Sequence, residues 1–393
     1  MTPTQQAMRG IVTELQHEFL EREEQIEAIV VAFLARENGM IFGDPGTGKS
    51  LLLESFCRRI IGAKYGRWLM DRQMGKEELL GPINLPKYRD TGEWERNITD
   101  TLLDATLAFF DEAGKTGPGV TTPLLTAINE GMGKAGNEWF DLPLVSAFGA
   151  TNEELEDQAA FDDRFLVRLW FHRLQQTDSV IKLLESSVTP RTSTTPTTVE
   201  LADVLAAIDH EIPKITVPAG VFQALAKLRF ELEDEQIYPS DRRLYKGIRL
   251  MQALAWLEGR DSVEEDDIAF LRHVLWLQDH ERTKVATACM RHVGESTRLA
   301  ITLGKAVQEL AVKLEDVKSR PTSEAAGLGG VLQMEINELR ERIEEASEEA
   351  VAKGRSTVRF EEVDLMLKEQ QVQVFVHCMK TPEAKARKQV GIA

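Results

Sequence analysis

The sequence is poor in cysteine and in long apolar runs, and each shortage excludes a class of protein. Only Cys57, Cys289 and Cys378 occur among the 393 residues, and they form no C-x-x-C pair. Neither a disulfide framework nor a zinc site is therefore expected, and a reducing cytoplasm fits the chain best. The sequence has no run of about 18 apolar residues and no basic segment followed by an apolar one at its N-terminus, so we expect no membrane span and no signal peptide.

Basic residues are also few for the length of the chain. The 47 lysines and arginines are outnumbered by 64 aspartates and glutamates, which gives a net charge of −17. This balance argues against a protein that binds the nucleic-acid backbone without sequence preference, because such a protein needs a basic surface. With 42 % apolar residues, the chain is long enough for two or three domains that each have a core.

The clearest motif is a phosphate-binding loop, G-x-x-x-x-G-K-[ST], formed by Gly43, Asp44, Pro45, Gly46, Thr47, Gly48, Lys49 and Ser50. In such a loop the backbone N–H groups face one anion, Lys49 reaches the β- and γ-phosphates of a nucleotide, and the Ser50 hydroxyl can ligate Mg²⁺. Residues 40–42 before it predict a strand, and residues 50–61 after it predict a helix whose positive end points at the phosphates. A glycine-rich turn that matches by chance is the alternative.

Strands and helices alternate along the first half of the chain. A helix is predicted over 22–36 and another over 118–130, and further strands are predicted within 65–74, 105–110, 142–150 and 164–172. This alternation predicts an α/β domain over residues 1–184 that is built on a parallel, doubly wound sheet of five strands. Residues 81–98 are rich in glycine and proline, and we expect a hairpin-like insertion there rather than a helix.

The second half of the chain has a helical pattern. Residues 185–200 contain almost no apolar side chain and predict a linker. A helical domain follows over 201–279, with helices at 221–233, 244–257 and 268–277, and a helical arm occupies 280–393. In the arm we expect a short strand at 372–376 and a disordered basic end at 380–388. Alternating spacings of four and three predict a coiled-coil-like hairpin, packed on itself or on a partner, along Leu332, Ile336, Leu339, Ile343, Ala346 and Ala350.

Two acids and one amide lie at predicted strand ends. Asp111 and Glu112 follow the apolar run 105–110, and Asn152 follows the strand 142–150. Ligand chemistry in such sheets gathers at the carboxyl ends of the strands. We therefore expect Asp111 to hold Mg²⁺, Glu112 to polarise the attacking water, and Asn152 to hold that water or to touch the γ-phosphate. The alternatives are a pair of strand-capping acids and a turn-forming asparagine.

These motifs together resemble the MoxR family of AAA+ ATPases over roughly residues 10–280. The resemblance rests on the segments 43–50, 109–112, 149–152 and 161–165, and on the family-specific segments 78–82 and 124–130. The segments 215–218, 240–243, 247–250 and 259–260 are similar to the lid of the RavA branch. Beyond residue 280 the chain departs from that branch, because the arm shows no convincing counterpart of the small β-rich module that RavA-like proteins carry.

The resemblance implies a hexameric ring in which each ATP lies between two protomers and an all-α lid follows the AAA+ sheet. Arg164 matches the arginine finger that reaches the γ-phosphate of the neighbour, and Arg242 matches the sensor-2 arginine that reports the nucleotide to the lid. Arg168 is an alternative finger. Arg164 and Arg168 could each be an ordinary ion-pair arginine, and Arg242 with Arg243 could be a solvated pair at a helix start.

The function that the resemblance implies is chaperone-like. A Mg²⁺-ATP-dependent ring would remodel, mature or activate a protein client, together with a von Willebrand A-domain protein. That partner would be a separate chain, since no D-x-S-x-S motif occurs here. The alternatives are a nucleotide-gated scaffold, a metal chelatase motor subunit and a nucleic-acid motor. The last would require basic pore loops, whereas the insertion offers only Lys87 and Arg89 beside Asp90 and Glu93, so no nucleic acid is expected.

Overall fold

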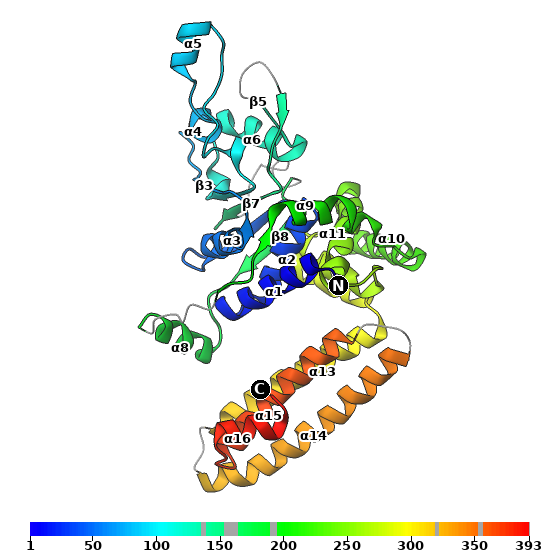
Figure 1. Ribbon diagram of the computed structural model, residues 1–393. Helices are drawn as coiled ribbons and strands as arrows, with labels where there is room; N and C mark the ends of the chain where they lie inside the picture. The colour runs from blue at the N-terminus through cyan, green and yellow to red at the C-terminus, as the bar shows by residue number, and fades with distance from the viewer. Residues whose placement is uncertain (135–138, 153–163, 189–194, 319–321, 353–356, 393) are drawn as a thin grey trace. The chain divides into compact units, whose positions relative to one another are not determined.

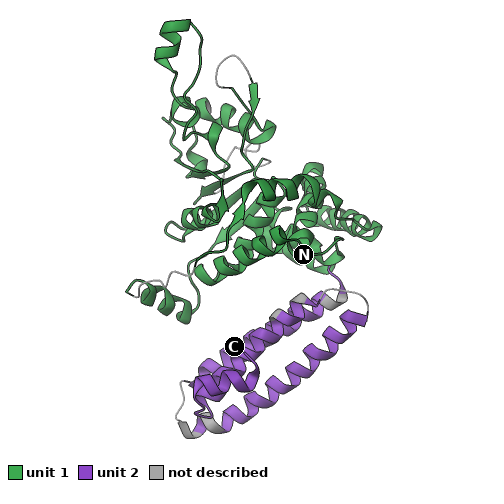
Figure 2. Ribbon diagram, in the orientation of Figure 1, with its two compact units in different colours: residues 1–292 green, residues 293–393 purple. Residues whose placement is uncertain are grey.

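The computed structural model describes residues 1–134, 139–152, 164–188, 195–318, 322–352 and 357–392. They form two compact units, residues 1–292 and 293–393 (Figure 2). The sequence placed a boundary near residue 280, but helix α12 (Arg282–Arg291) belongs to the first unit. Glu231 accepts contacts from Arg291 and from His292, whose Nε2 lies 2.8 Å away, and these contacts fix the end of α12 on helix α10 (Ala219–Asp234).

A five-stranded sheet forms the centre of the first unit (Figure 1). Its strand order is β3-β4-β7-β1-β8, and every neighbouring pair is parallel. The α/β class and the five-stranded parallel sheet are therefore confirmed. The strands are β1 (Gly39–Gly43), β3 (Tyr65–Leu69), β4 (Leu107–Asp111), β7 (Ser146–Thr151) and β8 (Val167–Phe171).

Apolar helix faces cover this sheet and share one core with it. Within that core, Phe33 of α2 and Phe56 of α3 meet edge to face with their ring centres 5.3 Å apart. The predicted helix 50–61 ends at Arg58, because Ile60–Ile61 form a short strand, β2, that pairs with β9 (Val199–Glu200). The helices of this layer are α1 (Pro3–Glu18), α2 (Glu23–Leu34), α3 (Lys49–Arg58) and α6 (Pro118–Glu130).

The predicted hairpin-like insertion 81–98 does pair antiparallel at its base, but it also contains a helix, which the prediction excluded. Helix α5 (Leu85–Thr91) follows α4 (Lys76–Leu80), and a single bridge pairs Ile83 with Arg96. The Asn84 side chain accepts the N–H of Lys87 at 3.2 Å, and Gly92 ends the helix with φ 70°. The polar and glycine residues are thus helix caps rather than hairpin turns. A true hairpin lies further on, between β5 (Met132–Lys134) and β6 (Trp139–Asp141).

The lid of the first unit is helical, as the pattern of residues 201–279 predicts. Helix α8 (Thr177–Ser186) follows β8, and the lid contains α9 (Leu201–His210), α10, α11 (Asp241–Leu257) and α12. The predicted helix 268–277 is a 3₁₀ segment, η4 (Glu265–His273), whose Asp267 side chain accepts the N–H of Glu264 at 2.8 Å. Shorter 3₁₀ turns are η1 (Leu102–Asp104), η2 (Ala113–Lys115), η3 (Ile212–Lys214) and η5 (Asp279–Glu281).

The second unit is a helical bundle of α13 (Glu295–Lys318), α14 (Thr322–Ala352), α15 (Val358–His377) and α16 (Glu383–Val390). All six seam residues of α14 are buried. The predicted strand 372–376 is wrong: it is part of α15, where Val372 and Val374 are buried, so packing overrides the strand preference of valine. The predicted disorder at 380–388 is also wrong, because α16 starts after Pro382 and ends at Gly391. In the described part of the chain, no helix is long and apolar enough to cross a membrane.

Candidate nucleotide site

Three neighbouring strands end at the same edge of the sheet. The phosphate loop leaves β1 at Gly43, Asn152 follows β7, and Asp111 is the last residue of β4. Because β4, β7 and β1 are adjacent and parallel, their carboxyl ends lie side by side. The fold thus brings together the phosphate loop, Asp111 and Asn152, which are far apart in the sequence.

The backbone of the loop depends on its glycines. Gly43, Gly46 and Gly48 have φ angles of 134°, 77° and 84°, which other residues rarely adopt. A Cβ on Gly43 would lie 2.2 Å from the carbonyl oxygen of Phe171, so this glycine also allows β1 to approach β8 closely. The loop enters α3 directly, and no side chain caps the first turn of that helix. Its N-terminal N–H groups are thus available to an anion.

Lys49 lies between the loop and the end of β7. Its Nζ donates to the carbonyl oxygen of Gly43 at 2.5 Å and lies 3.3 Å from Oδ1 of Asn152. The side chain is 8 % exposed, and this burial lowers the pKa of Lys49, although Asp111 and Asp44 act in the opposite direction. The structure therefore brings the lysine and the asparagine together beside the loop.

The two acids at the end of β4 each have a basic partner. Oδ2 of Asp111 lies 2.8 Å from Nη2 of Arg67, and Oε2 of Glu112 lies 2.8 Å from Nζ of Lys115. Glu112 has a left-handed backbone, with φ 54° and ψ 39°, which costs a non-glycine residue roughly 1 kcal/mol or more. Strain of this kind gathers at functional sites, and here it turns the chain sharply at the strand end.

Sequence reasoning missed three of the partners at this edge. Lys115 could have been found from its spacing of three after Glu112, but Arg67 could be placed only from the register that pairs β3 with β4. The third is Arg173, just after β8, whose Nε lies 2.9 Å from Oδ2 of Asp44. All three are exposed, and exposed pairs of this kind contribute about 1 kcal/mol or less.

The residues present fit a nucleotide with Mg²⁺. A hydroxyl at Ser50 and a carboxylate at Asp111 are the hard oxygen ligands that Mg²⁺ prefers, and this ion usually takes only one or two protein ligands beside phosphates and water. No group of three or more His, Cys, Asp or Glu side chains that could hold a metal is found in the described residues. The Ser50 carbonyl accepts the hydroxyl of Tyr65 at 3.3 Å, which ties the start of α3 to β3.

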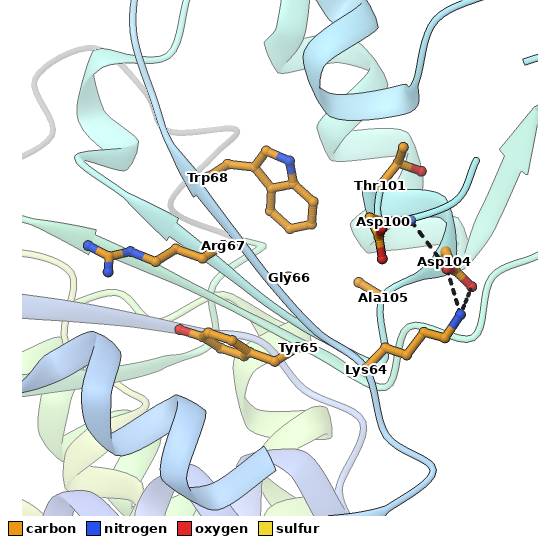
Figure 3. Close-up of a pocket in the computed structure, with 9 residues that line it drawn as sticks. All are labelled: Lys64, Tyr65, Gly66, Arg67, Trp68, Asp100, Thr101, Asp104 and Ala105. Carbon is orange, nitrogen blue, oxygen red and sulfur yellow. Dashed lines mark hydrogen bonds and ion pairs between the residues drawn. The ribbon is translucent and has the colours of Figure 1, made fainter. Parts of the chain in front are cut away.

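A separate cavity of about 340 Å³ lies at the outer edge of β3 (Figure 3). Trp68 points into it, and an ion pair of 2.7 Å between Lys64 and Asp104 lies on its rim. Arg67 lines the cavity and also contacts Asp111. The cavity therefore adjoins the nucleotide site without being part of the phosphate loop.

Of the four arginines at positions 164, 168, 242 and 243, two are structural. Nη1 of Arg168 donates to the carbonyl oxygen of Leu277 at 2.8 Å, and its guanidinium stacks on Phe42 and Trp276. Arg243 is fully buried and donates to the carbonyl oxygens of Leu166, at 3.0 Å, and Val274. Arg168 is thus held inside its own chain, and Arg243 is not a solvated arginine at a helix start.

The other two arginines, Arg164 and Arg242, are half-buried near the opposite edge of the sheet. Arg164 lies three residues before β8, and Arg242 adjoins Arg243, whose guanidinium contacts Leu166 at the same strand end.

An ion pair holds the first part of α11 at this edge. Lys246 contacts Glu37 at 2.5 Å, just before β1. Burial raises the pKa of Glu37, while Lys246 and Arg242 oppose the shift. Glu37 precedes the amino end of β1, and the phosphate loop leaves its carboxyl end at Gly43, roughly 13 Å further along the strand. The structure therefore does not bring Arg164 or Arg242 to the phosphate loop of its own chain.

Comparisons with known proteins agree with this architecture. Residues 6–209 match the family described as the MoxR domain in the MoxR-vWA-beta-propeller ternary systems. The chain belongs to the MoxR family of AAA+ ATPases. In this MoxR-family protein, residues 220–289 also match the AAA lid domain.

Individual relatives of this MoxR-family chain come from archaea and bacteria. Two uncharacterised proteins of Methanocaldococcus jannaschii are 32 % and 30 % identical to it, over 71 % and 70 % of this chain and 74 % and 72 % of theirs. The protein MoxR of Methylorubrum extorquens is 25 % identical, over 63 % of this chain and 79 % of its own. A solved structure from Cytophaga hutchinsonii, described as a candidate ATPase, shares the fold with a TM-score of 0.59 at 18 % identity, covering 74 % of this chain and 96 % of that one.

Proposed function

We propose that this chain is a Mg²⁺-ATP-dependent ring ATPase that remodels, matures or activates a protein client, as a chaperone does. The observation that carries the proposal is the meeting of three strand ends. They place the Lys49 ammonium 3.3 Å from Asn152 and set Asp111 and Glu112 at the end of the next strand. Phosphate binding, metal binding and water activation each need a group of this kind at one edge.

Each residue has a definite role in this proposal. Residues 43–50 bind the phosphates through their N–H groups and Lys49, while Ser50 and Asp111 hold Mg²⁺. The bound ion would neutralise charge on the phosphates. Glu112 takes a proton from the attacking water, and Asn152 positions that water. Breaking the exposed ion pair between Glu112 and Lys115 costs little free energy, because such pairs contribute about 1 kcal/mol or less.

We further propose that Arg164 and Arg242 act on the nucleotide of a neighbouring copy, in a hexameric ring. Their support is their position near the sheet edge opposite the phosphate loop. A head-to-tail contact joins two different surfaces of the same chain, and it forms a ring when the rotation closes. The amino edge of one copy would then face the carboxyl edge of the next. The ring of six rests on the family resemblance.

The proposed partners follow from the family. Because the matching family is described as part of MoxR-vWA-beta-propeller systems, we expect a separate von Willebrand A-domain protein beside the client. The RavA-like branch rests on the lid segments of the sequence. A nucleic-acid partner is not expected, since Lys87 in the insertion is paired with Glu93 and Glu95. The three cysteines are free and buried, which fits the proposed cytoplasmic location.

The test of the proposed chemistry is Glu112→Gln. This change keeps the size of the side chain and removes its ability to take a proton, so ATP binding should persist while turnover falls by a factor of about 10² or more. Steady-state hydrolysis and equilibrium nucleotide binding are the measurements. The control is Lys115→Gln, which removes the basic partner of Glu112 and should leave turnover within a few-fold. Near-normal hydrolysis by Glu112→Gln would refute the assignment.

The same variant tests the proposed client. Held in ATP, the Glu112→Gln protein should retain the von Willebrand A-domain partner and the client through affinity purification. Lys49→Ala, which removes the cation that reaches the phosphates, is the control that should lose them. Equal recovery by the two variants would show that protein binding does not depend on the nucleotide.

A further inference from the structure

Helix α8 carries an apolar face that is exposed among the described residues of its unit. Val180 and Ile181 are 38 % and 46 % exposed, and Leu183 and Leu184 are 55 % and 63 % exposed. At 100° per residue these four side chains occupy one side of the helix, with Lys182 on the other side. We call these four residues the α8 patch. Contiguous apolar surface of this kind marks an interaction site, unlike single exposed residues.

The chain fixes α8 beside the phosphate loop. The residues before it are held by Glu21, whose carboxylate accepts the N–H groups of Gln175 at 2.7 Å and Gln176 at 3.0 Å. Two residues earlier, Arg173 contacts Asp44 of the loop. A ten-residue helix is roughly 15 Å long, so the α8 patch lies within a helix length of this anchor.

A second exposed surface flanks Arg242. Tyr238 is 68 % exposed and Tyr245 is 78 % exposed, and they lie four residues before and three residues after Arg242. We call these two residues the lid tyrosines. Figure 1 shows α8 and the lid helix α10 on opposite sides of the first unit.

We propose that the α8 patch docks on the lid tyrosines of an adjacent copy of this chain. The inference rests on the proposed function, which turns Arg242 toward the phosphate loop of that neighbour. Tyr245 is one helical turn from Arg242, or about 5 Å along the axis. An arrangement that brings Arg242 to the loop therefore allows Tyr245 to approach the helix that starts beside the loop.

The chemistry of the two surfaces suits such a contact. Tyrosine offers a large ring and a hydroxyl that can stay hydrated at the rim, and it is enriched at interfaces. The α8 patch is too small to hold two copies together alone, because stable interfaces bury about 1,200 Å² or more. Assembly should therefore need both the nucleotide contact and the α8 contact. The lid of one copy would then be linked, through α8 and Arg173, to the loop of the next.

Cross-linking tests the proposed pair directly, because Cys57, Cys289 and Cys378 are all buried. In the ATP-bound Glu112→Gln background, Leu184→Cys combined with Tyr245→Cys should give a ladder of covalent oligomers with a short bismaleimide. Each single cysteine should remain monomeric. The control pair is Lys182→Cys with Tyr245→Cys, whose cysteine lies on the other side of α8 and should cross-link about tenfold less. An assembled ring without the ladder overturns the inference.

A charge substitution tests whether the contact supports assembly. Leu184→Glu should raise the protein concentration needed for half-assembly by a factor of about ten or more, whereas Lys182→Glu should change it little. Circular dichroism of both variants controls for folding. Equal assembly of the two variants overturns this inference and leaves the ring intact. Wild-type protein that stays monomeric with ATP overturns the proposed ring as well.

One further outcome assigns the patch differently. If Leu184→Glu assembles normally but no longer retains the von Willebrand A-domain protein, α8 is the docking site of that partner, and the inference is wrong. Retention of the partner together with impaired assembly supports the contact between copies.

Discussion

The two acids at the carboxyl edge of the central sheet and two arginines at its amino edge are held in opposite ways. At the carboxyl edge, Asp111 and Glu112 pair with exposed bases, and Glu112 has a strained backbone. At the amino edge, Arg168 and Arg243 are buried and donate to backbone carbonyl groups. Charges in weak, exposed pairs can change partners during a reaction, whereas buried arginines with backbone partners hold the lid on the sheet.

The same difference in burial divides two pairs of arginines that are close together in the sequence. Arg164 and Arg168 are four residues apart, and Arg242 and Arg243 are adjacent. In each pair one member is buried and the other is only half-buried. We expect the buried member to determine stability and the half-buried member to determine turnover.

The largest effect is expected for Arg164→Ala. Loss of an arginine finger can lower turnover by a factor of about 10³ or more, so this variant should assemble but hydrolyse almost no ATP. Arg168→Ala should instead lower the free energy of unfolding by about 3 kcal/mol. The Leu277 carbonyl would lose this donor, and a cavity would open beside the rings of Phe42 and Trp276. Hydrolysis assays and urea unfolding separate the two outcomes. A stable but inactive Arg168→Ala, together with an active Arg164→Ala, would show that Arg168 rather than Arg164 acts on the nucleotide.

Arg242 and Arg243 should divide turnover and stability between them in the same way, with smaller effects. Arg242→Ala should lower turnover about tenfold at nearly unchanged stability, as expected for one lost contact to the nucleotide. Arg243→Met should lower the free energy of unfolding by about 2 to 3 kcal/mol, because the carbonyls of Leu166 and Val274 lose a buried donor. Both quantities should be measured for both variants. Equal losses of stability would remove the distinction.

A further prediction concerns His273, the last residue of η4, and pH. Burial, and secondarily Arg272, lower the pKa of His273 to about 3. In the unfolded chain histidine titrates near 6.5, so below that pH the unfolded state binds a proton that the folded state does not. Stability should fall as the pH drops from 6.5 toward 3, by up to about 1.4 kcal/mol per pH unit.

The variant His273→Gln tests this assignment. It should reduce the slope of unfolding free energy against pH between 6.5 and 5, measured by urea unfolding, relative to the wild type. His280→Gln, at an exposed position, is the matched control and should keep the wild-type slope. A slope unchanged by His273→Gln would assign the pH dependence to other groups.

Much of the nucleotide edge was predictable because its signals are local. The phosphate loop is contiguous in sequence, and Asp111 and Asn152 each end an apolar strand. The order of the strands then brings them together, and the parallel topology was predictable from alternation. The partners from other strands, such as Arg67 and Arg173, could not be predicted. Their contacts depend on strand register and on the reach of the side chains, which the local sequence does not determine.

The errors elsewhere also have local causes. Asn84 and Gly92 are caps of α5, and polar and glycine residues of this kind are also typical of hairpin turns. Valine, as at 372 and 374, favours a strand by itself, but packing of these side chains in the bundle stabilises a helix instead. The part of the predicted arginine-finger segment at 161–163 lies outside the described residues.

The central claim is that each nucleotide site is completed by a second copy. The most direct measurement mixes Glu112→Gln, which keeps Arg164, with Arg164→Ala, which keeps Glu112, and follows ATP hydrolysis against the mixing ratio. Each variant alone should be nearly inactive. The mixture should regain activity, greatest near equal proportions, because some sites then combine an intact Glu112 with an intact Arg164 from the neighbour. Mixed rings that form but stay inactive at every ratio would contradict the account.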